Sequence, residues 1–85
     1  MPWALVITKP AVRDLKHLGR HDLRRVNTAF EAMRGNPYGG DIKFLQGSSG
    51  TLRRRVGDWR IIFVVDQKEK TVAILAVKRR TSTTY

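Results

Sequence analysis

The 85-residue sequence contains no cysteine, so a disulfide framework and a thiolate metal site are both excluded. No apolar run approaches the roughly 20 residues that a membrane-spanning helix needs. The segment Met1–Ile7 is apolar but lacks a basic flank and a small-residue cleavage site, which favours a first strand over a signal peptide. We therefore expect a cytoplasmic protein with no membrane partner, folded as one domain over residues 1–85 because so short a chain builds one core.

Acidic residues are scarce, with seven Asp and Glu against seventeen Lys and Arg, and the formal net charge is +10. A surplus of this size indicates nucleic acid or an acidic protein as a partner. The few carboxylates are scattered along the chain, and no Walker loop, GxGxxG or HExxH motif is present. His17 and His21 flank a turn between two predicted helices, where we expect surface or capping roles. We expect neither a metal nor a cofactor.

The segment Thr51–Val65 is rich in β-branched and aromatic residues and is interrupted once, by Gly57-Asp58. This pattern predicts two antiparallel strands, Leu52–Val56 and Trp59–Val65, joined by a tight turn. Side chains alternate between the two faces of a strand. The alternation places Arg53 and Arg55 on one face, and Leu52, Arg54 and Val56 on the other. Arg60 lies opposite the face shared by Trp59, Ile61, Phe63 and Val65.

The remaining patterns complete an α+β fold. Pro10 follows a possible cap at Thr8, as at many helix starts, and apolar residues spaced three and four apart predict a second helix. The expected elements are strands at Trp3–Thr8, Ile42–Leu45 and Thr71–Val77, helices at about Pro10–Leu18 and Arg20–Arg34, and the hairpin. We predict an N-terminal strand, an antiparallel helical hairpin, and a mostly antiparallel twisted sheet of about four further strands. The almost continuously apolar last strand should be central and buried on both faces.

The arginines permit a specific chemistry. Adjacent pairing of the late strands would bring Lys78–Arg80 near Arg53, Arg55 and Arg60 on the uncovered face. Such a cluster can clamp a phosphodiester and stabilise the added charge of a pentacoordinate phosphorane. Arginine is a poor general base, so the nucleophile would be the 2′-OH of RNA itself, without a metal. Tyr85 could stack on a base or donate a proton.

An ordered set of motifs resembles the RelE/ParE toxin superfamily of bacterial toxin–antitoxin pairs. The run L-R-R-R-V-G-D-W-R-I-I-F-V-V-D resembles the hairpin of that family, and T-V-A-I-L-A-V-K-R-R with a trailing tyrosine resembles its last strand. An A-x-x-D-L-x-x-L-like helix precedes them at Ala11, Asp14, Leu15 and Leu18. A K-x-L segment follows that helix at Lys43 and Leu45. The resemblance covers nearly the whole chain and implies a RelE-like fold.

The resemblance implies a ribosome-dependent mRNA endoribonuclease that is silenced in a heteromeric complex by a cognate acidic antitoxin. By position, it implies catalytic roles for Arg53, Arg55, Arg60, Arg80 and Tyr85, with Arg79 as a one-residue alternative to Arg80. Additional RNA contacts are expected from Lys43, Lys78 and Arg79. Some family members carry lysines in place of Arg53 and Arg55, and Arg54 occupies a position that is often apolar.

Two other functions remain open at this point. Members similar to ParE bind and poison DNA gyrase and cut no RNA, and they tend to lack the full Arg/Lys/Tyr set. A nucleic-acid-binding domain without activity would also be compatible with a charge of +10. The presence of Arg53, Arg55, Arg60, Arg80 and Tyr85 together favours the ribonuclease.

Overall fold

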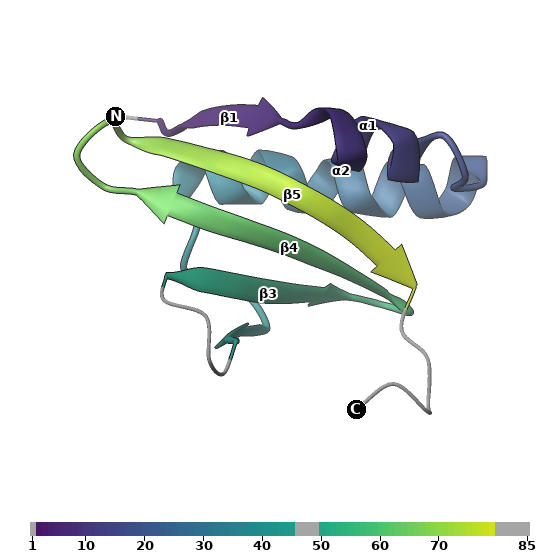
Figure 1. The fold of residues 1–85 in the computed structure, drawn as a ribbon. Coiled ribbons are helices and arrows are strands. Elements are labelled where there is room, and N and C mark those ends of the chain that lie inside the picture. The colour runs from purple at the N-terminus through teal and green to yellow at the C-terminus, as the bar shows by residue number, and fades with distance from the viewer. Residues whose placement is uncertain (1, 46–49, 80–85) are drawn as a thin grey trace.

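A computed structural model describes residues 2–45 and 50–79 of the chain. They form a five-stranded sheet with two helices, as predicted (Figure 1). The elements are β1 (Ala4–Ile7), α1 (Lys9–Leu15), α2 (Arg20–Gly35), β2 (Ile42–Phe44), β3 (Thr51–Val56), β4 (Trp59–Asp66) and β5 (Thr71–Arg79). The strand order is β1-β5-β4-β3-β2, in which only the β1–β5 pair is parallel. Neither helix is long and apolar enough to cross a membrane.

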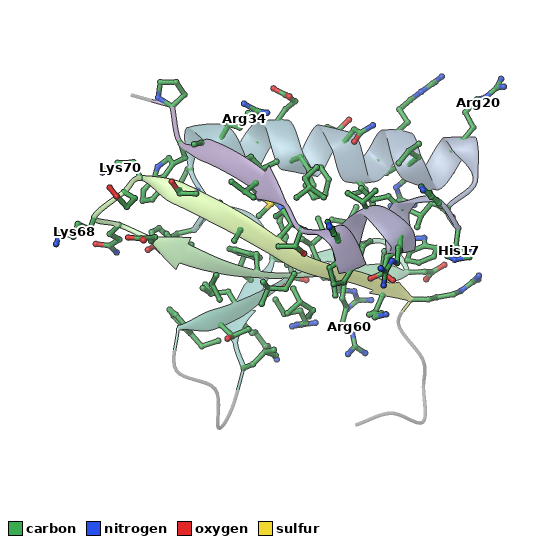
Figure 2. The ribbon with its side chains drawn as sticks, turned by 45° about the horizontal axis from the view of Figure 1, so that its top comes forward. His17, Arg20, Arg34, Arg60, Lys68 and Lys70 are labelled. Carbon is green, nitrogen blue, oxygen red and sulfur yellow. The ribbon has the colours of Figure 1, made fainter. Side chains whose placement is uncertain are left out.

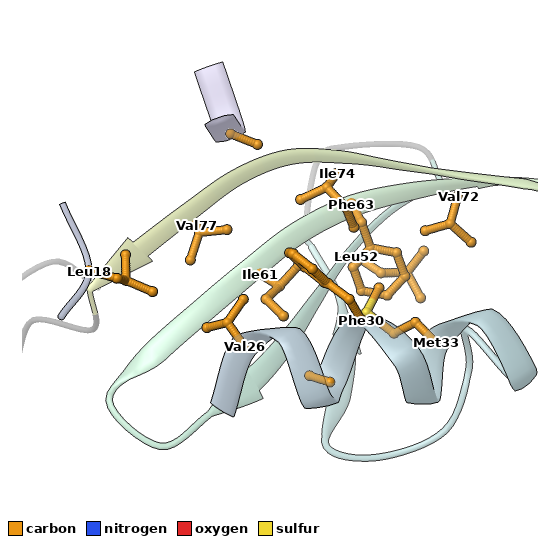
Figure 3. Close-up of a cluster of buried hydrophobic side chains, with 12 residues drawn as sticks. Leu18, Val26, Phe30, Met33, Leu52, Ile61, Phe63, Val72, Ile74 and Val77 are labelled. Carbon is orange, nitrogen blue, oxygen red and sulfur yellow. The ribbon is translucent and has the colours of Figure 1, made fainter. Parts of the chain in front are cut away.

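The helix α2 covers one face of the sheet, and the core lies between them (Figure 3). The apolar spacing along α2 buries Val26, Phe30 and Met33, while Leu23 packs partly buried against the same cluster. The opposite side of α2, including Arg24 and Glu31, is exposed. The predicted face of this helix is therefore confirmed. The sheet contributes Leu52, Ile61, Phe63, Val72, Ile74 and Val77 to the core.

The predicted hairpin is present, with β3 and β4 paired from Thr51↔Val64 to Val56↔Trp59. Gly57 begins the turn with φ +58°, a backbone conformation that favours glycine. Directly paired residues of antiparallel strands share a face. Arg54 therefore shares the helix-covered face with Ile61, and Arg55 shares the uncovered face with Arg60.

Two elements differ from the prediction by more than one residue at an end. The helix α1 ends at Leu15 instead of Leu18, although Leu18 is still buried in the core. Strand β5 continues to Arg79 and contains a bulge, because Ile62 pairs with Ala76 while Phe63 pairs with Ile74, which leaves Leu75 as the extra residue. As predicted, β5 lies inside the sheet. Its predicted burial on both faces is wrong, because the residues on its second face are half-buried or exposed.

Candidate nucleic-acid interface

The uncovered face of the sheet carries a row of three cations across three strands. Arg55 of β3 pairs with Arg60 of β4, which in turn pairs with Lys78 of β5. Side chains at directly paired positions have Cβ atoms about 4.5–5.5 Å apart, and like charges at such positions repel each other. Figure 2 shows Arg60 pointing away from α2. The row is therefore a poor arrangement for stability and a good one for binding an anion.

Two more cations extend this row toward the edge of the sheet. Arg53 lies two residues before Arg55 on the same face and pairs with Lys43 of β2. We call the resulting group of Lys43, Arg53, Arg55, Arg60 and Lys78 the basic face. Lys43, Arg55 and Lys78 are exposed, while Arg53 and Arg60 are half-buried. All five were singled out from the sequence, and the structure brings them together.

Arg79 does not belong to the basic face, so the expectation that Lys78–Arg80 would all lie there is wrong for this residue. Arg79 pairs with Trp59, whose side chain packs against the core on the helix-covered face. The Arg79 guanidinium carbon lies 5.9 Å from the centre of the Trp59 ring, within the range of a cation–π contact. The alternation of side chains along β5 is the reason. Arg80 and Tyr85 lie outside the described residues.

Arg54, for which the sequence analysis predicted no function, contacts the loop at Gly39 and Gly40. Its side chain points to the helix-covered side, and its Nη1 donates a hydrogen bond to the carbonyl oxygen of Gly39 at 3.1 Å. Gly40 has φ +80°, and a Cβ atom there would lie 2.7 Å from the Arg54 guanidinium carbon. An arginine is thus accommodated at an often apolar position because its charged end reaches the Gly39–Gly40 loop.

Asp14, which the sequence analysis named only as a member of the A-x-x-D-L-x-x-L-like motif, has a structural role. The strand β1 pairs with β5 only as far as Ile7↔Ile74. Beyond that point Asp14 of α1 takes the place of the missing strand, because its Oδ2 accepts a hydrogen bond from the Val77 backbone N–H at 2.9 Å. Its Oδ1 lies 3.1 Å from Nζ of Lys78. Asp14 therefore links α1 to the end of β5 that carries Lys78.

A comparison of sequences decides the family. Residues 5–83 match the sequence profile of the family described as "ParE toxin of type II toxin–antitoxin system, parDE". The chain belongs to this family. A Methanocaldococcus jannaschii protein named as a candidate toxin RelE1 is 31% identical to this toxin-family chain over 83 residues, which is 94% of the chain and 92% of that protein. The family lies within the RelE/ParE superfamily that the motifs resemble.

Solved structures agree with this assignment. The toxin-family chain is 32% identical to a chain of the RelBE2 toxin–antitoxin complex from Mycobacterium tuberculosis, with a TM-score of 0.83 over 94% of this chain and 100% of that one. For the RelE–RelB complex of Pyrococcus horikoshii the identity is 28% and the TM-score 0.83, over 98% and 100% of the two chains. The isolated RelE toxin of E. coli, at 13% identity, shares the fold with a TM-score of 0.81 over 96% and 88%.

Proposed function

We propose that this toxin-family chain is an endoribonuclease that cleaves mRNA on the ribosome, in the cytoplasm. The observation that carries the proposal is the row Arg55–Arg60–Lys78, which the register of three strands places on an uncovered face. Asp14 already pairs with Lys78 at one end of the row, and an anion between the members would offset the repulsion that remains. A phosphodiester of a single strand is an anion that such a flat, open face can reach.

The chemistry of the proposed site is positioning and charge stabilisation. The 2′-OH of the substrate attacks the adjacent phosphorus and gives its proton to solvent. The bond from phosphorus to the 5′ oxygen of the next nucleotide breaks, and that oxygen takes up a proton from solvent. The products are a 2′,3′-cyclic phosphate and a free 5′-OH. The phosphorane that forms on the way carries additional negative charge, which Arg53, Arg55 and Arg60 would stabilise more strongly than the ground state. Arginine does not deprotonate near neutral pH, so the ribosome would have to help orient the 2′-OH.

Two further residues complete the proposal by resemblance. Arg80 matches the arginine that closes the last strand in the family, and Tyr85 matches its C-terminal tyrosine. We assign Arg80 to the phosphate and Tyr85 to stacking on the substrate base. Lys43 and Lys78, at the two ends of the basic face, would hold the backbone on either side. Arg79 remains a proposed RNA contact, although its guanidinium lies over Trp59.

The test is primer extension on a message translated in a purified system. Arg60→Ala and Arg80→Ala should each lower the cleavage rate by about 100- to 1,000-fold, as expected for loss of one preorganised donor. Arg20→Ala and Arg24→Ala, on the exposed side of α2, should leave the rate near wild type. Naked RNA should be cut poorly by all of these proteins. Equal effects of the two pairs of substitutions would refute the assignment of the basic face.

The family match itself favours a second candidate, because the matching profile is that of ParE. In this case the chain would bind DNA gyrase and cleave nothing. A supercoiling assay beside the primer extension separates the two candidates. Wild-type protein that inhibits supercoiling and leaves the message intact would replace the ribonuclease with a gyrase inhibitor.

We also propose that an acidic antitoxin encoded beside this chain forms a complex with it. The relatives from Mycobacterium tuberculosis and Pyrococcus horikoshii were crystallised as a RelBE2 toxin–antitoxin complex and a RelE–RelB complex. The basic face has the charge to attract an acidic segment, and Val6, which pairs with Ala73 on the same uncovered side of the sheet, is 49% exposed. Co-expression with the neighbouring reading frame should give one peak containing both proteins in size exclusion, and separate peaks would contradict the proposal.

A further inference from the structure

A second group of arginines lies on the other side of β3, in a cleft beside α2. The cleft has a volume of about 390 Å³. Its polar lining consists of Arg25, Thr28, Asp41, Arg54 and Arg55. Arg25 comes from the side of α2 that faces the hairpin, and Arg54 comes from the helix-covered side of β3. The cleft is therefore distinct from the basic face, and only Arg55 belongs to both.

The guanidinium groups of Arg25 and Arg54 rest against glycines. A Cβ atom at Gly57 would lie 2.6 Å from Nη2 of Arg25, and one at Gly40 would lie 2.7 Å from the guanidinium carbon of Arg54. Both glycines have positive φ, so both turns favour a residue without a Cβ atom. The hydrogen bond to the Gly39 carbonyl also holds the Arg54 guanidinium beside the cleft before any ligand binds, which lowers the entropy cost of binding.

The charge of the cleft is not neutralised within the described part of the chain. Arg25, Arg54 and Arg55 make no ion pair with a described carboxylate, and Arg54 donates instead to the Gly39 carbonyl. Asp41 is the one acid among the residues that line the cleft. Because the Arg55 side chain points to the uncovered face, Arg25 and Arg54 supply the guanidinium groups of the cleft, and two of these against one carboxylate leave a surplus of positive charge. An anionic group is the ligand that this lining fits.

The path of the sheet edge connects the cleft to the basic face. The strand β2 pairs with β3 only at Leu52–Arg54, and the last bond between them runs from the Arg55 N–H to the Asp41 carbonyl. Among the described residues, no strand flanks β3 beyond that bond. A nucleic-acid backbone lying on the basic face can therefore pass around this edge at Arg55 and reach Arg25 with its next phosphates.

We propose that this cleft binds a backbone phosphate of single-stranded RNA, outside the nucleotides that lie on the basic face. The inference goes beyond the proposed cleavage, because a phosphate contact in the cleft requires no reaction. A phosphate repeats along a strand at every nucleotide, so a chain held at Arg55 supplies this anion to both sites. An acidic protein segment is the competing ligand, and the experiment separates the two.

The probe is a single-stranded RNA with 2′-O-methyl groups, which cannot be cleaved by 2′-OH attack. Its affinity for the full chain is measured by fluorescence anisotropy over a series of salt concentrations. Log affinity falls linearly with log salt concentration, and loss of one phosphate contact makes this slope shallower by about 0.7. Arg25→Gln, which keeps much of the aliphatic side chain, should show this decrease. Arg25→Lys keeps the charge and should therefore have a slope close to that of the wild type. Arg24→Gln, one residue away on the exposed side of α2, is the matched control and should keep the wild-type slope.

Asp41→Asn should change the RNA affinity in the opposite direction, which distinguishes a role in binding from a role in folding. Removing this carboxylate should tighten RNA binding, whereas a merely structural role would weaken it. A wild-type slope for Arg25→Gln, a weaker complex for Asp41→Asn, or no binding by the wild type at low salt would each overturn the proposal. It would also be overturned if Arg25→Gln weakened only the antitoxin complex. Because the probe is not cleaved, these results do not depend on whether the chain cuts mRNA.

Discussion

At the scale of single residues, alternation along a strand predicted correctly that Arg53, Arg55 and Arg60 share the face opposite the core. Pairing of Arg55 with Arg60 follows from a two-residue turn at Gly57-Asp58, which is readable in the sequence because glycine and aspartate are turn formers. The partner of Arg54 was not readable, because Gly39 lies 15 residues away in a loop without periodicity. The contact of Arg25 was not readable either, since only the folded hairpin brings Gly57 against this exposed side chain.

The fit between Arg54 and Gly40 gives a first prediction. Gly40→Ala should destabilise the protein by roughly 1–2 kcal/mol, because the residue keeps a positive φ that alanine rarely adopts. The new methyl group would also displace the Arg54 guanidinium from the Gly39 carbonyl. Urea titration measures the free energy of unfolding. Gly35→Ala, at the end of α2 with open space around it, is the control and should be neutral or stabilising by up to about 1 kcal/mol.

A second prediction concerns the buried side of α2. Phe30 is 4% exposed in the core (Figure 3), and Phe30→Ala should cost about 3–5 kcal/mol through lost burial and a residual cavity. The side chain of the neighbouring Glu31 is 77% exposed, and its one ion pair with a described residue is to Arg34 at 3.6 Å, so Glu31→Ala should cost less than about 1 kcal/mol. Similar losses in urea titrations of the two variants would show that α2 docks by another face.

At the scale of elements, the order and type of every strand and helix were predictable, whereas the way α1 joins β5 was not. Periodicity identifies a face of a helix, but it says nothing about a backbone partner 63 residues away. The bulge at Leu75 could not be predicted for a related reason. In an almost continuously apolar run, an added residue causes no visible break in the alternation of polar and apolar side chains. Both features set where the end of β5, with Lys78, lies relative to Arg60.

The Asp14 link can be tested on its own. Asp14→Ala leaves the Val77 N–H without its acceptor, which should cost roughly 1–3 kcal/mol. Asp14→Asn keeps an acceptor oxygen and removes only the charge beside the exposed Lys78, so its cost should be smaller. Amide hydrogen exchange at Val77 reports the difference directly, with faster exchange in Asp14→Ala than in Asp14→Asn. Equal protection of this amide in both variants would mean that Asp14 does not hold the end of β5.

At the scale of the whole molecule, the distribution of charge matters more than the total of +10. The molecule measures 34 × 30 × 23 Å, several times the screening length of about 8 Å at physiological ionic strength. Solvent ions therefore largely screen the charges at one end of the molecule from a partner that approaches the other end. Composition gave the total, but only the strand register shows that five cations share one face.

This separation leads to a prediction about the proposed antitoxin complex. Arg55 lies on the basic face, whereas Lys68 lies in the turn between β4 and β5, far from Arg60 in Figure 2. Arg55→Gln and Lys68→Gln change the net charge by the same amount. If the basic face attracts an acidic partner, Arg55→Gln should lower the association rate constant severalfold at low salt, and Lys68→Gln should hardly change it.

Stopped-flow mixing with the antitoxin over a range of salt concentrations measures both constants. The difference should shrink as salt rises, because screening removes long-range attraction and leaves the contacts that govern dissociation. Equal decreases for the two variants would show that net charge alone accelerates association and that the antitoxin approaches a different surface.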